Sequence, residues 1–158
     1  MYKKALTAEQ ALQKLRHFCA YQERSHQEAL QKLRQLHCAQ KVQDSVMASL
    51  IQDDYLNEER FAIAFAGGKW RAKQWGRYRI RYELKQKGVG DYCIQKALQQ
   101  IEDEEYLSVL SGLAMSKYDS MSGESSMIRQ KKTSDYLIAR GFEPALVRAV
   151  LNNCRSTP

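Results

Sequence analysis

The hydrophobic positions recur every three or four residues along almost the whole chain, which is the spacing of one helical face and not the alternation of a strand. The first run follows Thr7-Ala-Glu-Gln10, and the second follows Ser25-His-Gln-Glu28. Each tetrapeptide matches a capping box, in which two side chains satisfy free amides at the start of a helix. Asn57, with the two glutamates after it, is typical of another helix start.

Glycine, proline and acidic residues divide the rest of the chain into further helices. Gly76 separates two helical patterns, and Gly88-Val-Gly90 ends the second of them. Gly67-Gly68 would cost about 1 kcal/mol per residue inside a helix, so we expect either a helix end or a close approach of another backbone there. After Glu102-Asp-Glu-Glu105 the pattern predicts a helix with core positions Leu107, Leu110 and Leu113, a loop at 120–126, and helices at about 127–140 and 144–153.

Two segments of the chain resemble each other at a distance of 53 positions. Residues 87–98 align with residues 140–151, and each contains a basic residue, a glycine, an apolar residue and the same helical face. A weaker copy ends at Leu50. About nine short helices grouped in threes are the simplest description. The sequence therefore predicts an all-α fold, an elongated, curved array of three tandem three-helix repeats at 1–52, 53–101 and 102–158.

The composition is that of a globular protein, with 44% hydrophobic and 27% charged residues among 158. No apolar run reaches the roughly 18 residues of a membrane span, and the start of the chain lacks the pattern of a secretory signal. We therefore expect a soluble, cytoplasmic monomer with no membrane partner. The cysteines are far apart, and the spacings of His17 to Cys19 and of His37 to Cys38 make the side chains diverge on a helix, so no metal site and no other cofactor is predicted.

The positive charge of the chain is concentrated in one segment. Between Lys69 and Lys87 there are eight basic residues and one acidic residue, Glu83, which gives a net charge of +7 in 19 residues. The other 139 residues contain 17 basic and 17 acidic side chains. A cluster of this kind is typical of a surface that binds nucleic acid or an acidic protein groove.

Helical spacing places the charges of this segment beside aromatic rings. Ile80 and Leu84 define the core side of the helix after Gly76, and a stripe of Arg77, Arg81 and Lys85 lies next to it. Cations beside aromatic rings bind phosphates or carboxylates and stack on bases. The simpler interpretation, in which long basic side chains only solvate a helix face, is the alternative. The predicted binding residues are Lys69, Arg71, Lys73, Trp75, Arg77, Tyr78, Arg79, Arg81, Tyr82, Lys85 and Lys87.

The sequence contains no recognisable catalytic arrangement. A phosphate-binding glycine loop, a nucleophile elbow and a His-Glu-x-x-His pattern are all absent. Asp53-Asp54 and Glu58-Glu59 are explained by a helix start and need no metal. We therefore expect a binding protein and not an enzyme.

Two motifs resemble those of the RecX family, regulators of the bacterial recombinase RecA. They are Asp54-Tyr-Leu-Asn-Glu-Glu-Arg-Phe-Ala62 and Trp75-Gly-Arg-Tyr-Arg-Ile-Arg-Tyr-Glu-Leu-Lys-Gln-Lys-Gly88. The resemblance implies tandem three-helix repeats and binding to RecA filaments on single-stranded DNA. It also implies a non-enzymatic inhibitor of RecA, which limits filament growth, strand exchange and ATP hydrolysis. The processes in which such a regulator acts are DNA repair, homologous recombination and the SOS response. Its basic helix is the region matched by Arg77, Arg79, Arg81, Lys85 and Lys87.

Two other functions remain open at this point. A stand-alone DNA-binding protein with a helix-turn-helix at 76–101 would read the bases of duplex DNA with Asp91, Tyr92 and Gln95. A peptide-binding scaffold of the tetratricopeptide type fits less well, because the repeat length is nearer 50 than 34 residues.

Overall fold

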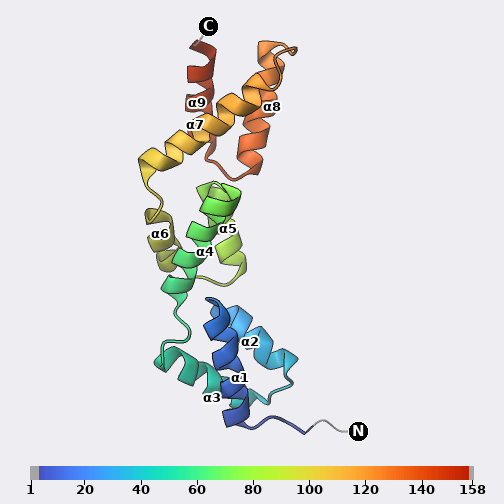
Figure 1. Cartoon of the computed structure of the whole chain (residues 1–158), viewed down its shortest axis with the longest axis vertical. Coiled ribbons are helices and arrows are strands. Elements are labelled where there is room, and N and C mark those ends of the chain that lie inside the picture. Colours follow the sequence, from blue (N-terminus) through green and yellow to red (C-terminus); the bar gives the residue numbers. More distant parts are fainter. Residues whose placement is uncertain (1–3, 157–158) are drawn as a thin grey trace. The chain divides into compact units, whose positions relative to one another are not determined.

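The computed structural model describes residues 4–156, and within them the chain forms nine α-helices and no strand (Figure 1). This confirms the prediction of an all-α chain with helices grouped in threes. None of the described helices is long and apolar enough to cross a membrane. The helices are α1 Ala8–Tyr21, α2 His26–Gln35, α3 Gln40–Gln52, α4 Glu58–Lys73, α5 Arg77–Gln86, α6 Asp91–Gln99, α7 Asp103–Asp119, α8 Ser126–Ala139 and α9 Pro144–Ser156.

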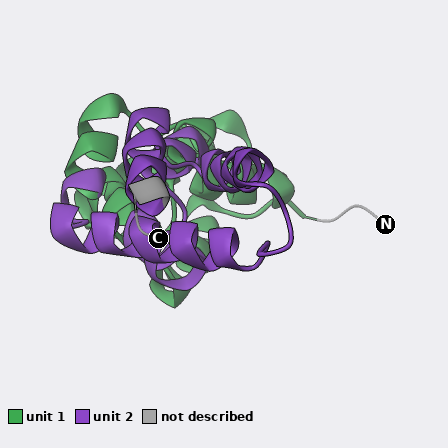
Figure 2. Ribbon diagram, turned by 90° about the horizontal axis from the view of Figure 1, so that it is seen from above, with its two compact units in different colours: residues 1–65, 84–97 green, residues 66–83, 98–158 purple. Residues whose placement is uncertain are grey.

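The chain divides into two compact units, coloured separately in Figure 2. The first unit contains residues 1–65 and 84–97, and the second contains residues 66–83 and 98–158. The helices α4, α5 and α6 therefore each contribute residues to both units. The binding residues predicted between 69 and 82 all belong to the second unit.

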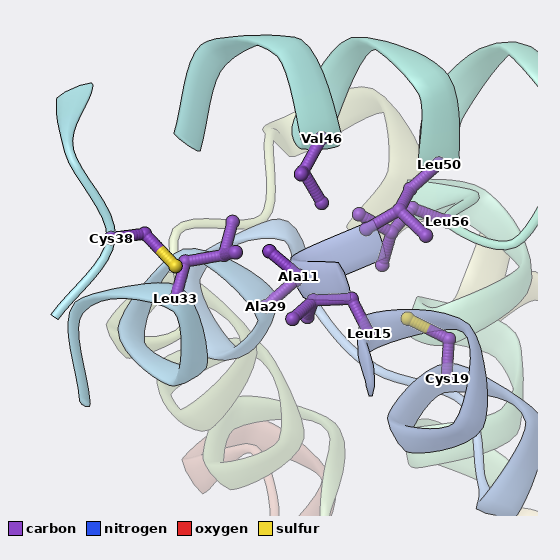
Figure 3. Packing of buried hydrophobic residues seen from close by; sticks show 9 residues of the cluster. All are labelled: Ala11, Leu15, Cys19, Ala29, Leu33, Cys38, Val46, Leu50 and Leu56. Atoms are coloured by element: carbon purple, nitrogen blue, oxygen red, sulfur yellow. The ribbon is translucent and has the colours of Figure 1, made fainter. Parts of the chain in front are cut away.

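The first three helices pack on one another around a common hydrophobic core (Figure 3). Leu15 of α1, Leu33 of α2 and Leu50 of α3 are completely buried. Each such leucine contributes about 1.5–3 kcal/mol of transfer free energy. The full core cluster consists of Ala11, Leu15, Cys19, Ala29, Leu33, Cys38, Val46, Leu50 and Leu56.

The predicted helix starts are confirmed, with one difference. Thr7 and Gln10 form the complete capping box, and Asn57 accepts a hydrogen bond from the Arg60 amide at 2.9 Å. Ser25 accepts from the amide of Glu28, but the Glu28 carboxylate lies 3.4 Å from Lys87 Nζ and does not complete a second box. An ion pair with a distant residue has replaced the local hydrogen bond.

Both expectations for the glycine pair in α4 are wrong. Gly67 and Gly68 lie inside a continuous helix, and no other backbone approaches them. A Cβ at Gly67 would meet the guanidinium group of Arg71, one turn later in the same helix, and a Cβ at Gly68 would meet nothing. The helix ends instead at Lys73, where Gln74 adopts a left-handed φ of 52°.

The second unit contains the last three helices, α7 to α9, which also pack on one another. The buried positions of α7 are Tyr106, Leu110 and Ala114, whereas Leu107 is 42% exposed and Leu113 is half-buried. The predicted core face of α7 was therefore wrong by one residue at each end. The completely buried Tyr106 stacks on the ring of Trp70 and contacts that of Phe142.

Two glycines bring the turn before α5 against the turn between α8 and α9. The amide of Gly76 donates to the carbonyl oxygen of Arg140 at 2.8 Å, and the amide of Tyr78 donates to that of Gly141 at 2.9 Å. A Cβ at Gly76 would overlap the backbone of Gly141, which itself has a φ of 99°. Glycine is required at both positions by close approach, and at Gly141 also by conformation.

Replacing Gly76 with alanine should therefore destabilise the protein by roughly 2–4 kcal/mol, because the added methyl group forces the two backbones apart. Gly68→Ala is the matched control: the site is open and helical, so this change should stabilise by about 0.5–1 kcal/mol. Urea denaturation of the two variants measures both effects. Equal changes in the free energy of unfolding would contradict the tight glycine contact.

Candidate interface for an anionic partner

The helix α5 buries two of its residues and exposes most of the others. Ile80 and Leu84 are completely buried, which confirms the predicted core side. At about 100° per residue, Tyr78 and Tyr82 lie opposite that side, with Arg81 on one flank and Arg79 on the other. The two tyrosines are 53% and 60% exposed, and both arginines are exposed. We call Tyr78, Arg79, Arg81 and Tyr82 the α5 face.

Arg77 does not belong to this exposed surface, although it was predicted to. Its side chain is only 22% exposed and pairs with two carboxylates, at 2.6 Å from Asp103 Oδ1 and 3.2 Å from Glu143 Oε2. Its guanidinium carbon also lies 3.8 Å from the centre of the Tyr106 ring. Arg77 is therefore not part of an exposed stripe with Arg81 and Lys85, as predicted, but packs inside the second unit.

The hydroxyl group of Tyr106 links Arg77 to Glu143. It accepts a hydrogen bond from the Arg77 amide at 3.1 Å and donates one to the Glu143 carboxylate. Burial, together with this bond to Glu143, raises the pKa of Tyr106 well above its ordinary value, so the hydroxyl remains protonated as a donor.

Trp75 and Lys69 lie beside the α5 face. The guanidinium carbon of Arg79 is 4.2 Å from the centre of the Trp75 ring, and Lys69 Nζ is 5.2 Å from it. Trp75 and Lys69 are half-buried, while Arg79 is exposed. A guanidinium group stacked on an indole ring keeps its planar edge directed toward other acceptors.

The remaining predicted residues divide by their environment. Arg71 and Lys73, in the last turn of α4, are exposed. Lys85 is also exposed, with Nζ 3.5 Å from Asp91, whereas Lys87 is half-buried, pairs with Glu28 and lies 5.6 Å from the ring of Phe65. Lys85 and Lys87 belong to the first unit.

The α5 face has no acidic partner in the described part of the chain. Among the described residues no carboxylate lies within ion-pair distance of Arg79 or Arg81, and the same holds for Arg71 and Lys73. Two unpaired arginines around two exposed phenol rings can bind phosphate or carboxylate groups and offer stacking surfaces to bases. In chemical terms, this surface is able to recognise an anion.

The described part of the chain contains no group of three or more histidine, cysteine or acidic residues arranged to hold a metal ion. The four cysteines are free, and burial raises the pKa of each thiol. A raised pKa leaves less of the reactive thiolate at neutral pH.

Three residues near the interface could not be identified from the sequence. Asp103, Tyr106 and Glu143 are 26, 29 and 66 positions away from Arg77, and no local pattern connects them to it. The available signals were local: the acidic run at 102–105, which contains Asp103, indicates a helix start, and the glycine before Phe142 indicates a helix end.

The two environments predict different effects of the same substitution. Arg77→Gln should lower the free energy of unfolding by roughly 2–3 kcal/mol, because it leaves the largely buried Glu143 carboxylate without its cation. Arg81→Gln should change it by less than about 0.5 kcal/mol. Urea denaturation compares the two variants, and similar small losses would mean that Arg77 is an ordinary surface residue.

Comparison with known proteins shows similarity to one protein family. Family models described as the second and third three-helix domains of RecX match residues 57–98 and 103–151. The regulatory protein RecX of Prosthecochloris aestuarii is 31% identical over 85% of this chain and 87% of its own length. Those of Lactobacillus gasseri and Bacillus cytotoxicus are 32% and 28% identical, and the chain spans about half of their length, 55% and 51%.

The fold is also that of solved RecX structures. The crystal structure of RecX from Lactobacillus salivarius superimposes with a TM-score of 0.85, at 21% identity, over 92% of this chain and 95% of that one. A second crystal structure of a regulatory protein RecX gives a TM-score of 0.83 at 19% identity, over 92% and 73% of the two chains. With the family models, the relative from Prosthecochloris aestuarii and the shared fold in agreement, this chain belongs to the RecX family.

Proposed function

We propose that this protein binds RecA filaments on single-stranded DNA and limits filament growth, strand exchange and ATP hydrolysis. The α5 face carries the proposal, because two exposed arginines and two exposed tyrosines lie together there with no acidic partner among the described residues, in a member of a family of regulatory proteins. The protein acts by occupancy. It makes and breaks no covalent bond, and its binding shifts the balance between addition and loss of RecA subunits.

A RecA–DNA filament offers the groups that this face can recognise. The DNA backbone carries one phosphate per nucleotide, and an arginine pairs with a phosphate or a carboxylate through two parallel hydrogen bonds. Arg71 and Lys73 are exposed in the same compact unit and add to the positive field that attracts such a partner, whereas Lys85 is paired with Asp91 in the other unit. Arg77 and Lys87 contribute to the fold instead, because their charges are already paired.

The proposal includes the organisation of the protein and the place where it acts. We propose repeat boundaries at 1–52, 53–101 and 102–158, so that the central repeat contains α4, α5 and α6. A regulator of this kind acts in the cytoplasm, where bacterial DNA lies, and we expect it to bind as a monomer.

The alternative function, a stand-alone DNA-binding protein, also has one observation in its favour. Asp91, Tyr92 and Gln95 are exposed at the start of α6, where a recognition helix would carry its base-reading side chains. Asp91 also lies 3.5 Å from Lys85 Nζ, which places a negative charge at that position. Sequence-selective footprints on duplex DNA without RecA would support this alternative and contradict our proposal.

Reversing the charge of the two arginines of the α5 face tests the proposal. Arg79→Glu with Arg81→Glu should weaken binding to RecA filaments by roughly tenfold or more, because two attractive charges become repulsive at the interface. Inhibition of strand exchange and of ATP hydrolysis should weaken in parallel. Binding measured at two salt concentrations separates this loss from a change in the fold.

The control carries the same change of charge on another helix. Lys131→Glu with Lys132→Glu alters two exposed lysines of α8, so the net charge falls equally. This variant should retain most of its affinity. Equal losses in the two double variants would mean that net charge, and not the α5 face, determines binding.

The tyrosines should matter for single strands in particular. Tyr78→Leu with Tyr82→Leu should lower affinity for single-stranded DNA about tenfold, because stacking of a base on an aromatic ring contributes about 1–3 kcal/mol. Tyr78→Phe with Tyr82→Phe keeps the rings and should bind normally. Affinity for duplex DNA, whose bases are already stacked, should not change in either variant. Fluorescence anisotropy with labelled oligonucleotides measures all of these affinities.

A further inference from the structure

We infer that Tyr106 and Glu143 are positioning residues for the α5 face, holding the start of α5 in place from the third repeat. The inference rests on the proposed function, since it concerns how the proposed binding surface is kept in its orientation. Neither residue lies on that surface. Tyr106 is completely buried, and the Glu143 side chain is only 18% exposed.

The first turn of α5 has no cap from its own sequence. The first amides of any helix lack partners within the helix, and a side chain just before the helix usually supplies one. Here the preceding residue is Gly76, which has no side chain. The partners come instead from the third repeat: the Arg77 amide donates to the Tyr106 hydroxyl at 3.1 Å, and the Tyr78 amide donates to the Gly141 carbonyl at 2.9 Å.

Glu143 stabilises this cap through its charge as well as its hydrogen bonds. A carboxylate near the start of a helix interacts favourably with the helix dipole. One carboxylate oxygen of Glu143 accepts from the Tyr106 hydroxyl, and the other lies 3.2 Å from Arg77 Nη1. The Tyr106 hydroxyl thereby serves as acceptor for α5 and as donor to Glu143, so that loss of either side chain breaks the same chain of bonds.

The cap acts directly beneath the binding residues. Tyr78 and Arg79 lie in the first turn of α5, and a Cβ at Gly141 would overlap that of Arg79. The same turn holds Arg79 over the Trp75 ring. A movement of this turn against the turn between α8 and α9 therefore displaces half of the α5 face, and its side chains are no longer aligned with the phosphates.

Removing the Glu143 charge distinguishes a positioning role from a purely electrostatic one, because the two roles predict changes in binding affinity of opposite sign. Glu143→Gln makes the protein more positive, which by charge alone would strengthen binding to an anion. If Glu143 positions the face, the same change weakens binding. We expect affinity for single-stranded DNA and for RecA filaments to fall about fivefold, as for the removal of one hydrogen bond.

The control is the other carboxylate that pairs with Arg77. Asp103 is 89% exposed, so Asp103→Asn removes an equal charge while Arg77, Tyr106 and Glu143 remain linked. Its affinity should be unchanged or higher. Tyr106→Phe provides a second variant that keeps the ring contacts with Trp70 and Phe142 and changes no charge, and its affinity should fall with that of Glu143→Gln.

Hydrogen–deuterium exchange supplies a readout that general destabilisation would not reproduce. In Glu143→Gln and Tyr106→Phe, the amides of residues 76–78 should exchange faster, while the amides inside α8 keep the wild-type rate. Binding at several salt concentrations should also show a smaller slope, by about 0.7 for each phosphate of a single strand that the variant no longer neutralises.

Each outcome supports or overturns the inference. Binding by Glu143→Gln as tight as that by Asp103→Asn would show that the carboxylate acts only as a charge. Uniformly faster exchange throughout the second unit would mean a merely structural role. Should Glu143→Gln fail to fold, normal binding by Tyr106→Phe would likewise overturn the inference. If Arg79→Glu with Arg81→Glu binds normally, the proposed function itself has failed, independently of the cap.

Discussion

The neutralisation of one arginine inside the second unit is the interaction on which the rest of this surface depends. Arg77 lies against the ring of Tyr106 and beside the largely buried carboxylate of Glu143, while its second carboxylate partner, Asp103, is 89% exposed and contributes little. A buried charge is costly unless it is paired and hydrogen-bonded, and here every partner comes from a residue distant in the sequence. The Tyr106 hydroxyl of this cluster also accepts from the Arg77 amide, so one cluster both compensates a charge and caps the start of a helix.

This arrangement divides a uniform run of basic residues into two groups with different tasks. Arg77 and Lys87 hold parts of the fold together through carboxylates within their own compact units. Arg79 and Arg81 have no such partner among the described residues and remain exposed beside Tyr78 and Tyr82. The two groups differ in their neighbouring residues and not in residue type. Of the segment with a net charge of +7, only a smaller exposed surface therefore remains available to an anionic partner.

A protein that acts as we propose, by occupancy, needs a rigid surface more than it needs reactive groups. The described part of the chain holds no group of three or more residues arranged for a metal ion, and burial raises the pKa of the four thiols. Much of the observed chemistry instead fixes helices in place: Gly76 and Gly141 permit close backbone contact, and Tyr106 caps a helix to which it does not belong. A surface fixed in this way would lose little conformational entropy on binding the proposed partner.

The sequence by itself determined the all-α class, the grouping of helices in threes, the RecX resemblance and most helix ends, because periodicity, caps such as Thr7 and Asn57, and charge density are local properties. It also predicted a basic helix after Gly76 and its buried side, Ile80 and Leu84. Only the tertiary structure decided that Gly67 and Gly68 continue a helix, that Tyr106 and not Leu107 faces the core, and that Arg77 points inward. These depend on side chains brought together from up to 66 positions apart, and helical spacing carries no information about contacts at that range.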